Sequence, residues 1–142
     1  MTAKITIRPA QPNDEEELFL LAQSFASSFA VERSFFSASF DALLQSPDAY
    51  LAVASRNGRV IGYLLGFDHR AFFANGRVAW VEEIMVAEDM RRLGAGSLLM
   101  ASIEEWSRGR QTKLIALATR RAADFYRSLG YEESATYFRR LL

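Results

Sequence analysis

The spacing of hydrophobic and polar residues changes several times along the chain, and each change predicts a different element. Residues 4–8 alternate apolar and polar positions, which is typical of a half-buried strand. From Asn13 onward the apolar positions recur every three or four residues. A helix is therefore expected to begin there, with Asn13 and Glu16 as a capping box. A second, short helix is expected over residues 39–45.

The middle of the chain has the pattern of antiparallel strands. Apolar, strand-like runs cover residues 50–55, 59–67 and 78–86. The dipeptides Asn57-Gly58 and Asn75-Gly76 lie between these runs, and Asn-Gly is the preferred sequence of a two-residue hairpin turn. The three strands should therefore follow one another as hairpins.

Helical and strand-like segments alternate in the last third of the chain. Helices are expected over residues 96–108 and 120–129, with a strand buried on both faces over the apolar segment 113–118 between them. Residues 131–133 and 136–141 are expected to close the chain as strands. This order predicts a single α/β domain over residues 1–142 whose first half is strongly antiparallel.

The composition argues against several classes of protein. Half of the 142 residues are hydrophobic, which is enough to form a sizeable core. The formal net charge is +0, so binding to nucleic acid through bulk positive charge is not expected. With no cysteine and a single histidine, His69, we expect no disulfide, no cysteine acyl-enzyme and no metal site. No apolar stretch has the length of a signal-peptide core or a membrane span, which predicts a cytoplasmic protein without a membrane partner.

One segment combines arginine and glycine at the start of a predicted helix. A helix N-terminus presents free backbone N–H groups and a partial positive charge. Glycine lets a ligand approach the backbone closely, and arginine adds charge-assisted bonds to phosphate. The segment consists of Arg91, Arg92, Leu93, Gly94, Ala95, Gly96 and Ser97. It is either a cradle for a phosphate or diphosphate, which we favour, or a turn needed only for close packing.

Two common phosphate-binding motifs do not fit this segment. A P-loop needs a Gly-Lys pair, and the chain contains none. A dinucleotide fingerprint needs a third glycine, but Leu99 stands at that position. The preceding strand also follows hairpins, whereas the fingerprint opens a parallel βαβ unit.

The segment instead resembles the [Arg/Gln]-x-x-Gly-x-[Gly/Ala] signature of the GNAT N-acyltransferase superfamily, with Arg91, Gly94 and Gly96 at the matching positions. The sequence AADFYRSLGY, residues 122–131, resembles the second motif of that family. The expected order of elements matches over nearly the whole chain. The resemblance implies a mixed α/β fold with a largely antiparallel central sheet, splayed fourth and fifth strands, and helices on both faces.

The resemblance also implies acetyl-CoA as the acyl donor. Its pyrophosphate would rest on the backbone N–H groups of residues 92–97. Its pantetheine arm would pair with the main chain of Ile84, Met85 and Val86, in the gap between the fourth and fifth strands. Family members often carry an asparagine after the fifth strand, where this chain has Thr119-Arg120-Arg121. Those arginines are either further phosphate contacts or, as we prefer, solvated charges in a first helical turn.

Acetylation of an amine needs a group that removes a proton from the ammonium, whose pKa is near 10. A carboxylate can do this, and Glu82 and Glu83 lie in an apolar strand where unpaired carboxylates are costly. Alternation places them on opposite faces unless a bulge intervenes, with Glu82 on the face of Trp80. The resemblance to polyamine and aminoglycoside acetyltransferases favours Glu82 as base or amine anchor. Glu83 is second, with a salt bridge to a neighbouring arginine as its alternative role.

A second group must protonate the departing thiolate. By the resemblance Tyr126 is the general acid, whereas helical spacing alone would make it part of an ordinary core stripe. His69 is a lesser candidate for the base: a lone histidine in a loop is usually a surface residue, and it could act only if that loop folds over the acceptor site. Three aromatic residues are expected either to line the acceptor pocket or simply to pack, namely Phe29, Phe35 and Phe36.

The expected function is direct transfer of acetyl from acetyl-CoA to a primary amine, most readily that of a small cationic molecule. Acetylation of protein N-termini or lysines is the alternative within the enzyme class. The alternatives from other classes are a CoA-binding sensor or interaction module without turnover, and an α/β binding domain without a CoA site. The closing segment TYFRRLL is apolar enough to pair with a second copy, so a homodimer is expected.

Overall fold

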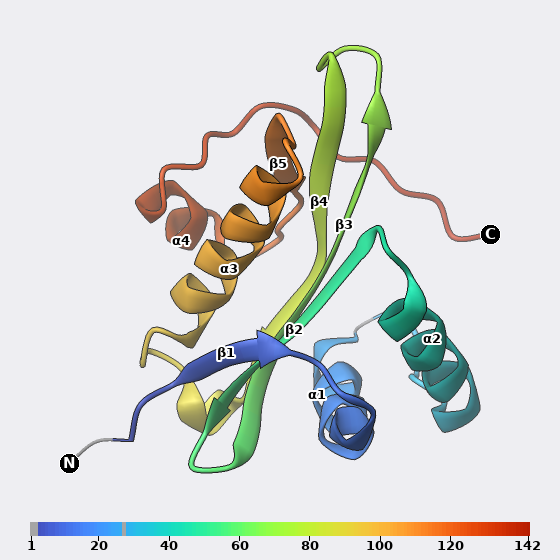
Figure 1. Cartoon of the computed structure of the whole chain (residues 1–142), viewed down its shortest axis with the longest axis vertical. Coiled ribbons are helices and arrows are strands. Elements are labelled where there is room, and N and C mark those ends of the chain that lie inside the picture. The colour runs from blue at the N-terminus through green and yellow to red at the C-terminus, as the bar shows by residue number, and fades with distance from the viewer. Residues whose placement is uncertain (1–2, 27) are drawn as a thin grey trace.

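A computed structural model describes residues 3–26 and 28–142 and contains one five-stranded mixed sheet (Figure 1). The strands lie in sequence order, β1 (Thr6–Pro9), β2 (Ala49–Arg56), β3 (Arg59–Ala71), β4 (Gly76–Val86) and β5 (Leu114–Leu117). The first four are antiparallel, and β5 runs parallel to β4. The mixed, largely antiparallel sheet is therefore confirmed.

Helices cover both faces of this sheet (Figure 1). They are α1 (Glu15–Phe25), α2 (Arg33–Gln45), α3 (Ala95–Gly109) and α4 (Ala123–Ser128), with short 3-10 turns at Pro12–Asp14 and Glu88–Met90. One hydrophobic core, which includes Ile61, Leu64 and Leu99, lies between the sheet and α3. The other, which includes Val53 and Phe40, lies under α1 and α2. Of the helices in the described residues, none has both the length and the apolar surface to cross a membrane.

The turns follow the sequence rules closely. Asn57 and Gly58 both adopt the left-handed conformation, with φ of 53° and 75°, as a type I′ hairpin requires. Asn75 does the same before β4, with φ of 57°. Both expected hairpins are confirmed, but the second turn spans the four residues 72–75, and Gly76 is the first residue of β4.

The helix starts differ from the expectation. The capping box is built by Gln11 and Asp14, not by Asn13 and Glu16, because Pro12 opens a 3-10 turn one position earlier. The α2 helix begins at Arg33, well before residue 39. The first turn of α2 is held by ion pairs from Arg33 to α1, and such tertiary contacts cannot be read from local spacing.

The prediction for the end of the chain was also wrong. Residues 131–142 form no strand, and this segment runs extended from α4, past the sheet, to the side of α1 and α2 (Figure 1). The β5 strand is also less buried than expected, since Leu114 is 39% exposed. Among the described strands β5 pairs with β4 alone, so its other edge is uncovered and Leu114 is exposed.

Candidate active site

The sheet opens between β4 and β5 halfway along β4. Their pairing ends where Val81 lies opposite Leu117, yet β4 continues to Val86. A cleft of about 2730 Å³ follows this gap, from the side of α1 and α2 to the start of α3. The expected splay of the fourth and fifth strands is therefore confirmed.

The free edge of β4 presents alternate backbone groups to this gap. Ala87 N donates to Ile61 O over 2.7 Å, so this opposed pair is of the hydrogen-bonded type. In an antiparallel ladder hydrogen-bonded and non-hydrogen-bonded pairs alternate. Because Val86 is paired with Gly62 and Ile84 with Leu64, the main-chain groups of Ile84 and Val86 point away from β3. Those of Met85 point toward β3, so Ile84 and Val86 supply the open edge.

The N-terminus of α3 meets the same cleft. Leu98 N is bonded to Gly94 O at 3.1 Å, and the earlier N–H groups of the helix, at residues 95–97, have no partner within the helix. Gly94 caps the helix with φ of 93°, a conformation that a side chain would strain. A Cβ on Gly96 would come within 3.2 Å of the Phe125 ring, so glycine allows α4 to pack here.

The residues before α3 and in its first turn do not contribute equally to the lining of the cleft. Arg91 and Arg92 line the cleft, as do Gly94, Ala95, Gly96 and Ser97. Arg91 Nε donates to Val86 O at 3.2 Å, which ties this turn to the open edge of β4. Leu93 is exposed and is not among the lining residues, so only its backbone can take part in a cradle.

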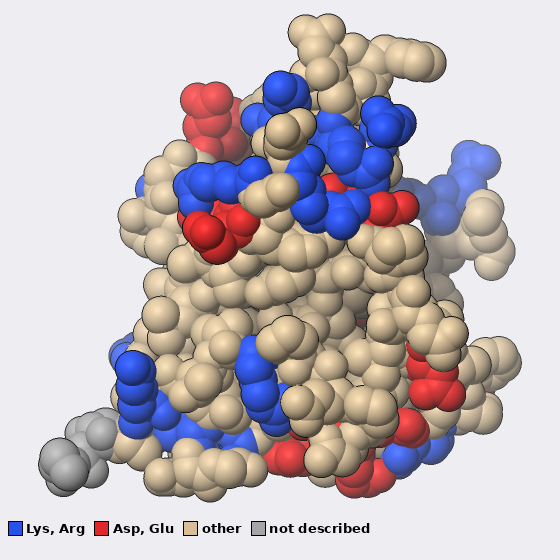
Figure 2. Space-filling view, viewed as in Figure 1, with Lys and Arg blue, Asp and Glu red and all other residues tan. Residues whose placement is uncertain are grey.

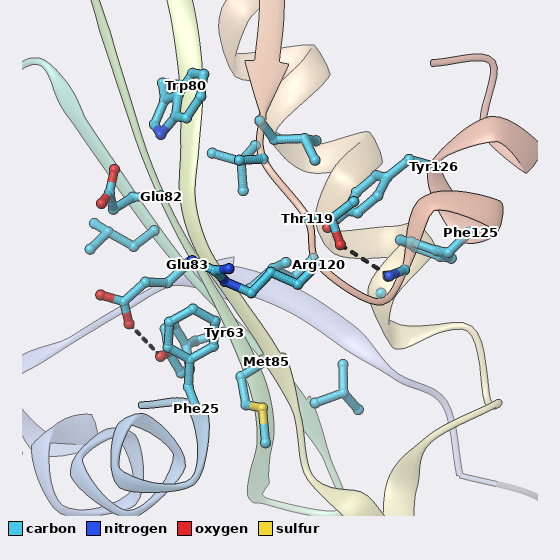
Figure 3. Close-up of a pocket in the computed structure, with 18 of the residues that line it drawn as sticks. Phe25, Tyr63, Trp80, Glu82, Glu83, Met85, Thr119, Arg120, Phe125 and Tyr126 are labelled. Atoms are coloured by element: carbon cyan, nitrogen blue, oxygen red, sulfur yellow. Dashed lines mark hydrogen bonds between the residues drawn. The ribbon is translucent and has the colours of Figure 1, made fainter. Parts of the chain in front are cut away.

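A β-bulge places both glutamates on one face of β4. Leu65 is paired with Glu83 and Gly66 with Val81, so Glu82 has no partner on β3. The two carboxylates accordingly extend to the same side of β4 (Figure 3). Ile84 and Val86 pack on the other face, against the core under α3, so simple alternation from Glu82 to Ile84 was wrong.

Glu83 is held by a tyrosine that the sequence analysis did not single out. Tyr63 donates its hydroxyl hydrogen to Glu83 Oε1 at 2.7 Å, and this bond takes the place of the salt bridge offered as an alternative. Burial raises the pKa of Glu83, the Tyr63 bond opposes this, and the charge of Glu82 raises the pKa further. Tyr63 could have been found only from the register of β3 on β4.

Tyr126 lies across the gap from the glutamates (Figure 3). It is 8% exposed, belongs to the core under α3, and still lines the cleft. Its ring is packed edge-on by Phe125 and Tyr131, with centroids 5.0 and 6.1 Å away. Burial raises the pKa of its hydroxyl, so Tyr126 is protonated at neutral pH, as a proton donor must be.

Residues 16–131 match the family model described as the acetyltransferase (GNAT) family. This span contains the bulged glutamates, the α3 turn and Tyr126. The chain belongs to the GNAT family. It is therefore an acetyl-CoA-dependent N-acetyltransferase, and the family expected from the sequence is confirmed.

Known relatives of this GNAT chain include enzymes that acetylate small amines. It is 29% identical over 141 residues to an aminoalkylphosphonate N-acetyltransferase of Salmonella typhimurium, covering 96% of this chain and 90% of the relative. A transcriptional regulator from Bacillus halodurans superposes with a TM-score of 0.88 at 22% identity, over 98% and 100% of the two chains. The aminoglycoside N-acetyltransferase AAC(6')-Iy, in complex with CoA, superposes at 0.85 and 18% identity, over 99% and 97%. The two superpositions show the fold alone.

The remaining candidates differ in whether they line the cleft. His69 lies within β3, opposite Val78, so its expected place in a loop was wrong, and it does not line the cleft of this GNAT domain. Phe29, Phe35 and Phe36 all line the cleft on the side of α1 and α2. Arg120 extends from the end of β5 toward β4, near Glu83 in the view of Figure 3 and away from the α3 turn.

Proposed function

We propose that this GNAT enzyme acetylates the primary amine of a small molecule that presents the amine as a cation. The bulge that directs Glu82 and Glu83 into one cleft carries this proposal. Two carboxylates on one wall attract an ammonium and can take its proton. The relative that acts on aminoalkylphosphonates also has a small amine as its acceptor. We further propose that residues 1–142 act as a single domain.

The residues present fit acetyl-CoA as the donor. The N–H groups of residues 95–97, with Arg91 and Arg92 beside them, form an anion site for the diphosphate. The open main-chain groups of Ile84 and Val86 can pair with the amides of the pantetheine arm as an added strand would. A side chain at Gly94 or Gly96 would disturb this cradle.

The chemistry that we propose divides between four groups. Glu82 accepts the proton of the ammonium, and the amine nitrogen then forms the new bond to the acetyl carbon. The Ile84 N–H, which points into the gap, stabilises the negative charge that develops on the carbonyl oxygen. Tyr126 gives its proton to the sulfur as the carbon–sulfur bond breaks, and the second proton that the nitrogen loses on becoming an amide restores the Tyr126 hydroxyl. Glu83, fixed by Tyr63, adds the second negative charge that holds the ammonium.

Titration calorimetry of acetyl-CoA into the wild type and Gly94→Glu tests the donor site. The wild type should bind with a Kd on the order of 1 μM, and the variant about 100-fold more weakly or not at all. The reason is that glutamate strains the backbone at φ of 93° and brings negative charge to an anion site.

Gly58→Glu is the matched control for this experiment. Gly58 also has positive φ and open space around it, but it lies in the β2–β3 turn outside the cleft. It should lose stability as Gly94→Glu does and keep wild-type affinity for acetyl-CoA. No binding by the folded wild type would contradict the donor site and every role assigned to it. Turnover only with peptides, and not with small amines, would contradict the acceptor assignment.

Tyr126→Phe should lower kcat by about 10²-fold, the low end of what a general acid contributes. Phenylalanine keeps the ring contacts with Phe125 and Tyr131 and removes only the hydroxyl. Affinity for acetyl-CoA and the melting temperature should change little. Steady-state rates of thiol release measure the effect. An unchanged kcat would mean that Tyr126 is only a core residue.

A further inference from the structure

The C-terminal segment, residues 131–142, lines part of the cleft in which we place the acceptor. The ring of Tyr137 stacks on Trp80, with centroids 6.3 Å apart and an interplanar angle of 23°. Two residues later, Arg139 Nη1 donates to Ser28 Oγ at 2.7 Å. Tyr137 and Arg139 both line the cleft. The segment is therefore fixed at one end to β4 and at the other to the loop between α1 and α2.

These two attachments flank the glutamates. Trp80 precedes Glu82 by two positions on β4, a rise of about 7 Å. Ser28 follows α1 by three residues and lines the cleft, as do Phe25, the last residue of α1, and Tyr63, the partner of Glu83. Successive Cα atoms are about 3.8 Å apart, so Arg139 is rooted within about 8 Å of the residue that stacks on Trp80. The side chain of Arg139 therefore lines the same cleft as the two carboxylates.

Most N–H groups of the Arg139 side chain have no acceptor among the described residues. A guanidinium carries five N–H groups, and the contact with Ser28 uses one of them. Other arginines are paired with carboxylates, among them Arg33, Arg59, Arg77 and Arg110. Among the described residues, Arg139 forms no such ion pair and its side chain is exposed. An arginine in this state is suited to a planar, bidentate contact with a carboxylate, phosphate or phosphonate.

We propose that Arg139 binds an anionic group on the acceptor while Glu82 and Glu83 hold its ammonium. The acceptor class is then a zwitterionic primary amine, and neither a simple alkylamine nor a polycation. This inference rests on the proposed function, because it divides the same acceptor site into an anionic and a cationic half. It assigns the selection of acceptors to a segment that lies outside the sheet.

The test is a comparison of matched acceptors. Rates of thiol release are measured with ω-aminoalkylphosphonates and ω-amino acids of two to five carbons, against n-alkylamines of the same length. The wild type should favour one length of the anionic series by 10-fold or more in kcat/KM. Arg139→Gln should reduce that ratio 10- to 100-fold, because a neutral amide replaces a charge-assisted bond. Arg139→Lys should restore part of it.

Arg140→Gln is the matched control, since Arg140 is the next residue, is exposed, and does not line the cleft. It should keep the wild-type ratio. The proposal is overturned if the wild type prefers n-alkylamines or spermidine, if Arg139→Gln keeps the ratio, or if Arg120→Gln abolishes it instead. Failure of the proposed function looks different, because the wild type would then bind no acetyl-CoA in the calorimeter or acetylate no amine in either series.

Discussion

Replacing Glu82 with glutamine should lower kcat/KM for the amine acceptor by about 10²- to 10⁴-fold, the contribution of a positioned general base. Glutamine has the shape of glutamate and cannot take up the proton of the ammonium. The bulge directs this side chain into the cleft, away from the α3 turn, so affinity for acetyl-CoA should stay at the wild-type value. Initial rates of thiol release and calorimetric titration measure the two quantities separately.

The pH dependence of kcat/KM distinguishes the loss of a general base from the loss of a group that only binds the amine. Without a base the reaction depends on free amine, whose fraction rises about tenfold per pH unit below a pKa near 10. The residual kcat/KM of Glu82→Gln should therefore climb steadily toward pH 10. A loss confined to KM, with an unchanged profile, would show that Glu82 only anchors the amine.

Two further variants complete this experiment. Glu83→Gln can still accept the Tyr63 hydrogen bond, so it should raise KM by a few-fold with a smaller loss in kcat. Glu105→Gln removes a carboxylate from the exposed side of α3, outside the cleft, and should leave both constants unchanged. If Glu83→Gln costs more than Glu82→Gln, the raised pKa of the buried carboxyl identifies Glu83 as the base.

Local rules account for the part of the fold that the sequence predicts well. The Asn57-Gly58 turn needs two left-handed residues in succession, and few dipeptides other than Asn-Gly provide them. The start of α3 was recognised in the same way, because Gly94 acts through its own backbone conformation. Such features depend on a handful of neighbouring residues, so a single sequence is enough.

The parts that the sequence did not predict depend on partners distant in the chain. The bulge at Glu82 exists only relative to Leu65 and Gly66, so no pattern within β4 reveals it. The C-terminal segment has the composition of a strand, but the short β5 offers it no ladder, and its side chains contact Trp80 and Ser28 instead. Hydrophobic periodicity shows which positions are apolar, but it does not show which residues they will contact.

Removing the carboxylate of Asp68 should cost about 3–5 kcal/mol of the free energy of unfolding, the usual cost of breaking a buried ion pair. Asp68 is 2% exposed and accepts bonds from Arg77 Nη2 at 2.8 Å and Arg110 Nε at 2.6 Å. These contacts join β3, β4 and the end of α3, where Lys and Arg side chains gather on the surface (Figure 2). In Asp68→Asn both guanidinium groups stay partly buried and keep only the more exposed carboxylate of Asp48 as a counter-charge.

The same carboxylate makes stability depend on acid pH, with a sign that follows from its pKa. Burial alone would raise the pKa of Asp68, but hydrogen bonds from Arg77 and Arg110 outweigh burial and lower it to about 2 from 3.8. A lowered pKa stabilises the fold above pH 3.8, and this stabilisation is lost as the pH falls toward 2. The expected loss over that window is about 2 kcal/mol. Asp68→Asn should lack this share of the acid dependence.

Urea denaturation of wild type, Asp68→Asn and Asp124→Asn at pH 7, 4 and 2.5 tests both statements. Asp124 pairs with Arg127 on the surface of α4 at 3.0 Å, so its loss should change the free energy of unfolding by less than about 1 kcal/mol. Wild type and Asp68→Asn should differ most at pH 7 and less at pH 2.5, because the carboxyl of Asp68 is then largely protonated in the unfolded state and most of the linked stabilisation is lost. A constant difference across the three pH values would mean that packing, and not the ionised carboxylate, makes Asp68 important.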